Sequence, residues 1–247
     1  MHRLFLVLLL LLTIRLVNAQ PQHEYVDLGL PSGTLWATCN IGSDNDIYLV
    51  KYFSWGDTVP IPSSVYYQDP FKPKKKHQKK SKVYDGIMSF NHIYKYFKDA
   101  DSHKITKYCS LLEYGNDGYT DSLSTLERID DAASILWGND WCTPTIEQWR
   151  ELAEQCTWKH VWRGEWDGYE VTGVNGQSIF LPNAGYRRGF GYLYVPAEGC
   201  YWSSSLNTKE PDDAFSIYFD SEKIDYHCTT YRSWGLTIRP VRRVNVE

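Results

Sequence analysis

The sequence lacks the short motifs by which many catalytic and metal sites are recognised. It contains no CxxC, HExxH or GxSxG motif and no glycine-rich phosphate loop. After the first 19 residues, it has no apolar run long enough to cross a membrane. A formal net charge of −4 also disfavours nucleic acid as a partner. We therefore expect no enzyme, no cofactor, no metal site and no membrane span.

The chain does contain a segment that is typical of a signal peptide. Residues 1–19, MHRLFLVLLLLLTIRLVNA, place basic residues before an apolar run and end in small residues. A retained membrane anchor is the alternative. No cysteine stands at the expected cleavage point, so a lipid anchor is not expected. We expect an exported protein that stays in the periplasm, reaches the outer cell surface or is secreted.

Six cysteines follow this leader, and an exported chain permits them to form disulfides. Six cysteines allow 15 connectivities, among which the sequence does not choose. A direct bridge between Cys142 and Cys156 is not expected. The helix predicted between them would be ~15 Å long, whereas bridged Cα atoms lie within ~7 Å of each other.

Residues 20–247 are expected to form one domain with an insertion at about 60–83. This insertion has seven lysines between Lys72 and Lys82. A solvated loop is the simpler interpretation. The alternative is a docking patch for a polyanion at Lys72–Lys82.

Strand patterns dominate both ends of the domain. Residues 24–42 predict two strands around a Pro-Ser-Gly turn, 52–57 a short strand or aromatic turn, and 104–109 a strand. Asn175-Gly176 predicts a hairpin within 168–182. Further strands are expected in the ranges 200–205, 213–219, 223–228 and 234–241.

One helix is predicted between these strand regions. Thr145 and Gln148 form a capping box, and Trp149 lies on the apolar face that follows. Asp130 or Asp131 is expected to cap a shorter helix, with a structural calcium ligand as the alternative. Strands at both ends with helix between them predict an α+β fold.

Several motifs follow one another along the chain: VDLGLPSGTLWATCNIG, YFSWGD, LERIDDAA, WGNDWCTPTIEQW, CTW, SIFLPNAGYR, YWSSS and RSWGLTIRPV. This is the order found in the Fibrobacter succinogenes major paralogous domain family, which the chain resembles over about residues 24–243. The resemblance implies a C-type-lectin-like fold, shared with formylglycine-generating enzymes, with short antiparallel sheets, one or two packed helices and long loops. It also implies export from gut Bacteroidetes. Five tryptophans, with Thr145, are assigned to the scaffold: Trp36, Trp141, Trp149, Trp202 and Trp234.

This resemblance favours a non-catalytic binding or display domain that recognises a protein or glycan through its C-terminal loops. Tyrosine and arginine suit such recognition because they offer large contact area and directional hydrogen bonds. The exposed candidates in the C-terminal loops are Asn207, Lys209, Asp225, His227, Thr229 and Tyr231. A second candidate loop carries Arg187, Arg188, Phe190, Tyr192 and Tyr194.

Three other functions stay open at this point. A cysteine- or metal-dependent oxidase is the first, although Cys200 and Cys228 lack the short spacing of the copper-holding pair in the related enzymes. A calcium-dependent sugar lectin is the second, because Glu210-Pro211-Asp212 is similar to a lectin triplet; a turn between strands is the simpler interpretation. A structural component of a surface assembly is the third.

Overall fold

The structure, a computed structural model, describes residues 23–43, 50–61, 94–99, 103–164, 166–188 and 191–243. The predicted signal peptide and nearly all of the insertion at 60–83, with Lys72–Lys82, lie outside these residues. Among the described helices, none combines the length and apolar character needed to span a bilayer.

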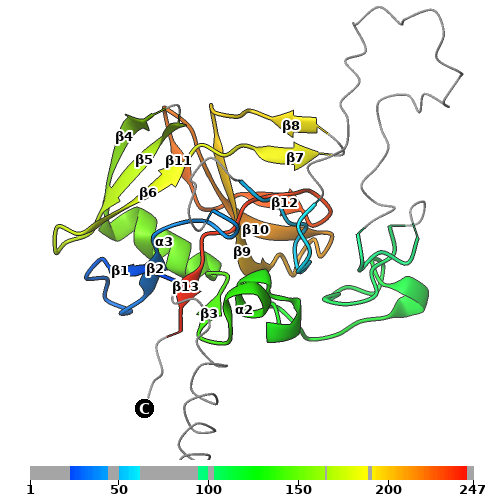
Figure 1. Cartoon of the computed structure of the whole chain (residues 1–247). Helices are drawn as coiled ribbons and strands as arrows, with labels where there is room; N and C mark the ends of the chain where they lie inside the picture. Colours follow the sequence, from blue (N-terminus) through cyan, green and yellow to red (C-terminus); the bar gives the residue numbers. More distant parts are fainter. Residues whose placement is uncertain are drawn as a thin grey trace, which may run out of the picture.

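The described chain forms short helices and short strands, arranged as Figure 1 shows. The helices are η2 (Asn116–Gly118), η3 (Arg128–Asp130), α2 (Ala132–Trp137) and α3 (Ile146–Gln155). The strands are β1 (Tyr25–Asp27), β2 (Leu35–Ala37), β3 (Trp141–Cys142), β4 (Thr157–Arg163), β5 (Trp166–Thr172), β6 (Ser178–Pro182), β7 (Tyr186–Arg188), β8 (Gly191–Leu193), β9 (Gly199–Leu206), β10 (Asp213–Phe219), β11 (Ile224–Asp225), β12 (Thr229–Tyr231) and β13 (Val241–Arg242).

These strands form several small sheets in which paired strands run antiparallel. The order β1-β2-β13-β3 brings the first and last described strands into one sheet. A second sheet pairs β10 with β9, β11 and β12, and a third has the order β4-β5-β6. Strands β7 and β8 form a two-stranded sheet at one end of the molecule (Figure 1). Antiparallel sheets with two α-helices in the described residues confirm the α+β prediction.

Helix α3 forms where the sequence predicts it. The Thr145 hydroxyl accepts a hydrogen bond from the Gln148 amide at 3.3 Å, and the Gln148 side chain accepts one from the Thr145 amide at 2.9 Å. This reciprocal pair satisfies two amides that the first helical turn leaves unpaired. Trp149 and Leu152 are fully buried on its apolar face. The shorter helix α2 begins after Asp131, whose side chain accepts a hydrogen bond from Ala133, as the capping interpretation predicted.

Two predicted hairpins are confirmed, and the strands predicted over 104–109 and 234–241 are wrong. The β1–β2 pair turns at Pro31–Gly33, and β5 pairs with β6 around Asn175-Gly176, where Gly176 has a φ of 82°. Residues 104–109 do not form a strand. Ile105 makes only isolated bridges, and Tyr108 has a φ of 60°, which breaks the extended geometry that a strand requires. Gly235, Leu236 and Thr237 make only isolated bridges, each to a different segment, and β13 begins at Val241.

Two aromatic clusters form the core. One surrounds α3 and includes Trp36, Trp149, Tyr201 and Phe219. The other lies between α2 and β9 and includes Trp55, Tyr108, Trp141 and Trp202. The scaffold assignments of Trp36, Trp141, Trp149 and Trp202 are therefore confirmed. Trp234 is only half-buried at the edge of the second cluster, which corrects its assignment to the core.

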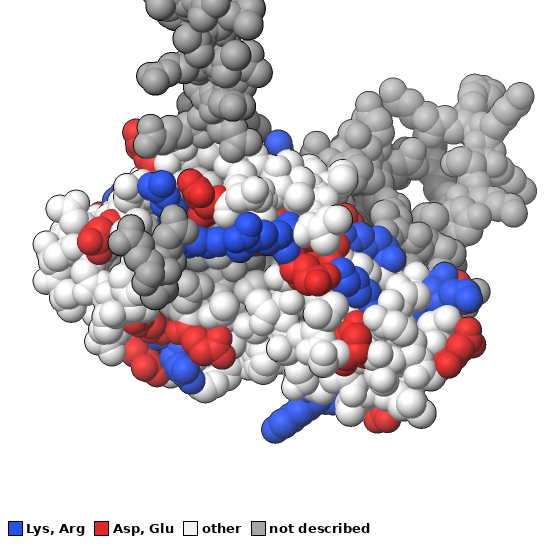
Figure 2. Space-filling model, turned by 90° about the horizontal axis from the view of Figure 1, so that it is seen from below, with Lys and Arg blue, Asp and Glu red and all other residues white. Residues whose placement is uncertain are grey.

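Charged side chains of both signs are interspersed on the face seen from below the view of Figure 1. Figure 2 shows basic and acidic residues next to each other in mixed groups, with uncharged surface between the groups. Elsewhere in the described chain, Arg242 and Asp140 form a mixed pair whose charged atoms lie 3.6 Å apart. The face seen in Figure 2 therefore offers little to attract a strongly charged partner.

Candidate functional site

A row of aromatic side chains brings the two candidate loops together. We define the aromatic strip as Tyr194, Tyr186, Trp234 and Tyr231, with Arg188 beside them. The ring of Tyr186 stacks on Trp234 with centroids 5.2 Å apart and planes 5° from parallel. Tyr194 lies 5.7 Å from Tyr186, and Tyr231 lies 5.8 Å from Trp234. The guanidinium of Arg188 lies 5.2 Å from the Trp234 ring.

The two ends of the strip are open to solvent. Tyr194 is 55% exposed and Tyr231 is 52% exposed, whereas Tyr186 and Trp234 are half-buried. Burial, with a smaller contribution from neighbouring Tyr194, raises the pKa of Tyr186, so its hydroxyl stays protonated at neutral pH. The strip thus offers aromatic faces, tyrosine hydroxyls and one cation within a short distance.

The backbone explains why residues so distant in sequence meet here. Strand β7 makes two hydrogen bonds to the C-terminal segment, from Arg187 to Gly235 at 2.7 Å and from Gly235 to Arg187 at 2.9 Å. Glycine allows this close approach, because a Cβ at position 235 would lie 2.5 Å from Ile61 and 3.2 Å from Arg187. Residues 186 and 188 therefore flank Trp234.

A buried arginine holds the loop that carries Tyr231 and Trp234. Arg232 is 0% exposed and donates to the Tyr94 hydroxyl at 2.8 Å. It also donates to the carbonyl groups of Lys107, Tyr108 and Pro211 at 3.0, 3.0 and 2.7 Å. Four rings surround its guanidinium, with centroids 4.9–5.8 Å away: Trp55, Tyr94, Tyr96 and Tyr108. Apart from the bond to Pro211, these contacts anchor the loop to segments more than 100 residues upstream.

The structure brings some of the sequence-predicted residues into this strip and leaves others outside it. Arg188, Tyr194 and Tyr231 are members. Lys209 and His227 are exposed elsewhere, and Asp225 and Thr229 are half-buried outside the strip. The side chain of Tyr192 and all of Phe190 lie outside the description, although Tyr192 pairs with Arg187 through the backbone.

Two candidates were wrongly expected to be exposed. Arg187 is 1% exposed, because its side chain turns inward and donates to the Ile61 carbonyl at 3.2 Å. Asn207 is 8% exposed, and its side-chain oxygen accepts from the Lys209 amide at 3.2 Å, which closes the turn between β9 and β10. A backbone-bonding asparagine is typical of such turns.

The Glu210-Pro211-Asp212 triplet also belongs to this turn. The Glu210 amide donates to the Asn207 carbonyl at 3.2 Å, and the Asp213 amide donates to the Glu210 carbonyl at 2.8 Å. Burial and nearby Asp212 raise the pKa of Asp213 to about 6, and one of its buried carboxylate oxygens has no hydrogen-bond partner. Among the described residues, no group of histidine, cysteine and acidic side chains is arranged to hold a metal. The turn interpretation fits this geometry.

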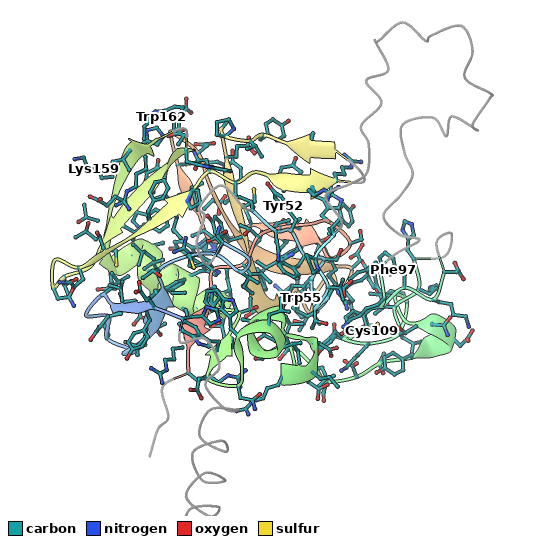
Figure 3. All side chains as sticks on the ribbon, viewed as in Figure 1. Tyr52, Trp55, Phe97, Cys109, Lys159 and Trp162 are labelled. Carbon is teal, nitrogen blue, oxygen red and sulfur yellow. The ribbon has the colours of Figure 1, made fainter. Side chains whose placement is uncertain are left out.

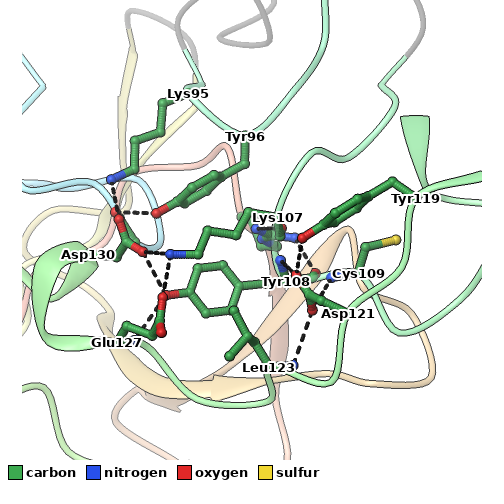
Figure 4. A network of polar contacts seen from close by, with 12 residues as sticks. Lys95, Tyr96, Lys107, Tyr108, Cys109, Tyr119, Asp121, Leu123, Glu127 and Asp130 are labelled. Carbon is green, nitrogen blue, oxygen red and sulfur yellow. Dashed lines mark hydrogen bonds and ion pairs between the residues drawn. The ribbon is translucent and has the colours of Figure 1, made fainter. Parts of the chain in front are cut away.

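A polar network around Asp130 is a structural anchor (Figure 4). Its carboxylate accepts from Lys107 at 2.6 Å, from Tyr108 at 2.8 Å and from Lys95 at 3.0 Å. Burial alone would raise the pKa of Asp130, but these donors and Tyr96 lower it well below its usual range. Burial and Asp130 raise the pKa values of Tyr96 and Tyr108. Asp130, Tyr96 and Tyr108 are thus not placed to exchange protons near neutral pH.

All six cysteines lie in the described residues and are present as thiols. Burial raises the pKa of Cys142 and of Cys156 to about 11 and that of Cys228 to about 12. The pKa values of Cys109 and Cys200 are also raised, mainly by burial. Thiolate chemistry needs the opposite shift, so these five thiols give no support to the oxidase alternative.

Sequence reasoning missed Tyr186 and misplaced Trp234, the two central rings of the strip. A hydropathy pattern does not reveal that β7 pairs with residue 235, nearly 50 positions later. Figure 3 shows another exposed aromatic, Trp162, at the outer end of β4; it is 63% exposed and lies outside the strip. Comparisons with protein-family models, curated proteins and solved structures find no match.

Proposed function

We propose that this chain is an exported, non-catalytic recognition domain that binds a protein or glycan through the aromatic strip. The observation that carries this proposal is the meeting of Arg188, Tyr194 and Tyr231 with Trp234 in one partly exposed row. Aromatic residues and arginine carry much of the binding energy at protein interfaces. Aromatic faces next to hydroxyl groups also suit amphipathic ligands such as sugars, because the rings offer apolar contact and the hydroxyl groups offer hydrogen bonds.

The fold and family belong to the same proposal. We assign the chain to the Fibrobacter succinogenes major paralogous domain family, with a C-type-lectin-like fold. The ordered motifs support this assignment, as do the antiparallel sheets and the capped helix α3. The leader-like residues 1–19 support export.

A glycan and host-protein array probed with the purified protein tests the proposed function. The matched variants are Tyr194→Ala/Tyr231→Ala, which removes both open ends of the strip, and Trp162→Ala, which removes an exposed aromatic elsewhere. We expect specific hits that the double variant loses and Trp162→Ala keeps. Hits that survive in the double variant would move the site away from the strip. A complete absence of hits would favour a structural component, which light scattering would detect as self-association.

A further inference from the structure

A second site candidate is a cavity of about 230 Å³ that shares no residue with the aromatic strip. It lies between the segment after β2, the end of β4 and strand β6. Its polar lining consists of Thr38, Asn40, Ser43, Arg163, Ser178 and Arg239. Two cations and three hydroxyl-bearing side chains thus meet around one small space, and no carboxylate contributes to the described lining.

Arg239 is the buried cation of this cavity. It is 1% exposed and donates to the Asn40 side chain at 2.7 Å and to the carbonyl groups of Ala37 and Phe180 at 3.0 and 2.8 Å. The Tyr201 hydroxyl is a further partner. All four partners are neutral, and a guanidinium has five N–H donors. Within the described chain, no carboxylate forms an ion pair with it.

Burying a charge without an opposite charge nearby costs free energy, and the groups around the charge must offset this cost. Arg232 shows one solution, because four aromatic rings surround its guanidinium and stabilise it by cation–π attraction. Within the described residues, no ring takes such a position at Arg239. Arg239 also lines a cavity. An anion in that cavity would supply the missing negative charge.

The rest of the lining strengthens this argument. Arg163 lies over the Phe180 ring at 4.8 Å, and its charge is partly balanced by Glu170 at 2.7 Å. The cavity therefore carries one net positive charge, because Glu170 balances only one of the two cations, Arg163 and Arg239. The Ser178 hydroxyl can donate a hydrogen bond to an oxygen atom of a ligand, whereas the Thr38 hydroxyl already donates to the Glu24 carbonyl at 3.5 Å.

We propose that this cavity binds a small oxyanion, namely a carboxylate or sulfate group on a ligand no larger than a monosaccharide. Its volume lies below the ~300–1,000 Å³ of drug-sized pockets, which sets the upper limit on the ligand. Charge-assisted hydrogen bonds to an oxyanion are about twice as strong as neutral ones, so the charged group supplies most of the affinity.

Calorimetric titration and thermal unfolding of the purified protein test this proposal. The probes are glucuronate, inorganic sulfate and glucose, all at equal ionic strength set with sodium chloride. At ten times its Kd, a bound anion should raise the Tm by about 3–6 °C. Glucose, which has the size of glucuronate but no charge, should leave the Tm unchanged. Binding of sulfate without glucuronate would support the oxyanion site and restrict it to inorganic anions.

Three variants place the binding in the cavity. Ser178→Leu fills it and should weaken anion affinity at least about 10-fold, and Arg163→Gln should weaken it about 3-fold or more by removing the cation at the rim. Gln177→Leu changes an exposed neighbour that does not line the cavity and should leave the affinity unchanged. The proposal is overturned if no anion binds saturably, if glucose binds as well as glucuronate, or if Ser178→Leu binds as the wild type does. Tyr194→Ala/Tyr231→Ala should bind the anion normally, so this test is independent of the proposed strip.

Discussion

Replacement of Arg232 by methionine tests how the loop that carries Tyr231 and Trp234 is held in place. Methionine keeps an unbranched apolar stem of similar length but removes every N–H donor. Three carbonyl groups and the Tyr94 hydroxyl would lose a charged partner that lies 2.7–3.0 Å away. The four surrounding rings would also lose their cation.

The size of the effect follows from these contacts. A hydrogen bond to a charged group contributes about 1.5–3 kcal/mol, and four of them set an upper limit. The substitution also removes the cost of burying the guanidinium, which offsets part of this loss. We expect the free energy of unfolding to fall by about 3–5 kcal/mol. Arg232→Lys should lower the free energy of unfolding by less, because its ammonium group keeps the positive charge. Some loss should remain, because the ammonium group lacks the planar fork of donors.

Urea unfolding followed by tryptophan fluorescence measures this difference, since ten tryptophans report on the fold. Arg242→Met is the matched control. Its guanidinium lies 5.0 Å from the Tyr25 ring and its side chain is 33% exposed, so we expect a change below about 1 kcal/mol. If Arg232→Met lowers the free energy of unfolding no more than Arg242→Met does, Arg232 does not anchor the loop and the reasoning is wrong.

Two further predictions concern stability. Thr145→Ala removes one half of the capping box of α3 and should lower the free energy of unfolding by about 1 kcal/mol in urea titrations, whereas Thr145→Ser should restore most of it; equal loss in both variants would contradict the capping role. Asp213 has a folded-state pKa of about 6, above the ordinary aspartate pKa of 3.8, so it stabilises the fold at low pH and this contribution is lost as the pH rises from about 4 to 6. Wild type should therefore lose about 1–2 kcal/mol relative to Asp213→Asn between pH 4 and pH 7. A pH-independent difference would show that Asp213 does not titrate in this range.

Local signals in the sequence were sufficient for much of the fold. The capping box at Thr145 and the Asn175-Gly176 turn depend on residues within four positions of each other, and both formed as predicted. The strand predicted over 104–109 did not form, because contacts with distant residues decide the conformation there. Tyr108 takes a positive φ there, while its hydroxyl bonds to Asp130 and its ring packs against Trp55, and these tertiary contacts override the strand propensity.

The candidate site was predictable only in part. Tyr194 and Tyr231 were identified from residue type and loop position, and both are exposed as expected. Arg187 shows the limit of that approach, because residue type alone does not tell an arginine that binds a partner from one that bonds a buried carbonyl. The central position of Trp234 depends on the pairing of Arg187 with Gly235, which involves two segments far apart in sequence.

The most direct test of the proposed strip is the Kd of one array-selected ligand for four proteins. These are the wild type, Tyr194→Ala, Tyr231→Ala and Trp162→Ala, compared by surface plasmon resonance after circular dichroism has shown equal folding. If the strip is the binding surface, each tyrosine variant should weaken binding about 10-fold or more, and Trp162→Ala should bind as the wild type does. Equal Kd values for the wild type and both tyrosine variants would contradict the account, because the ligand would then bind elsewhere.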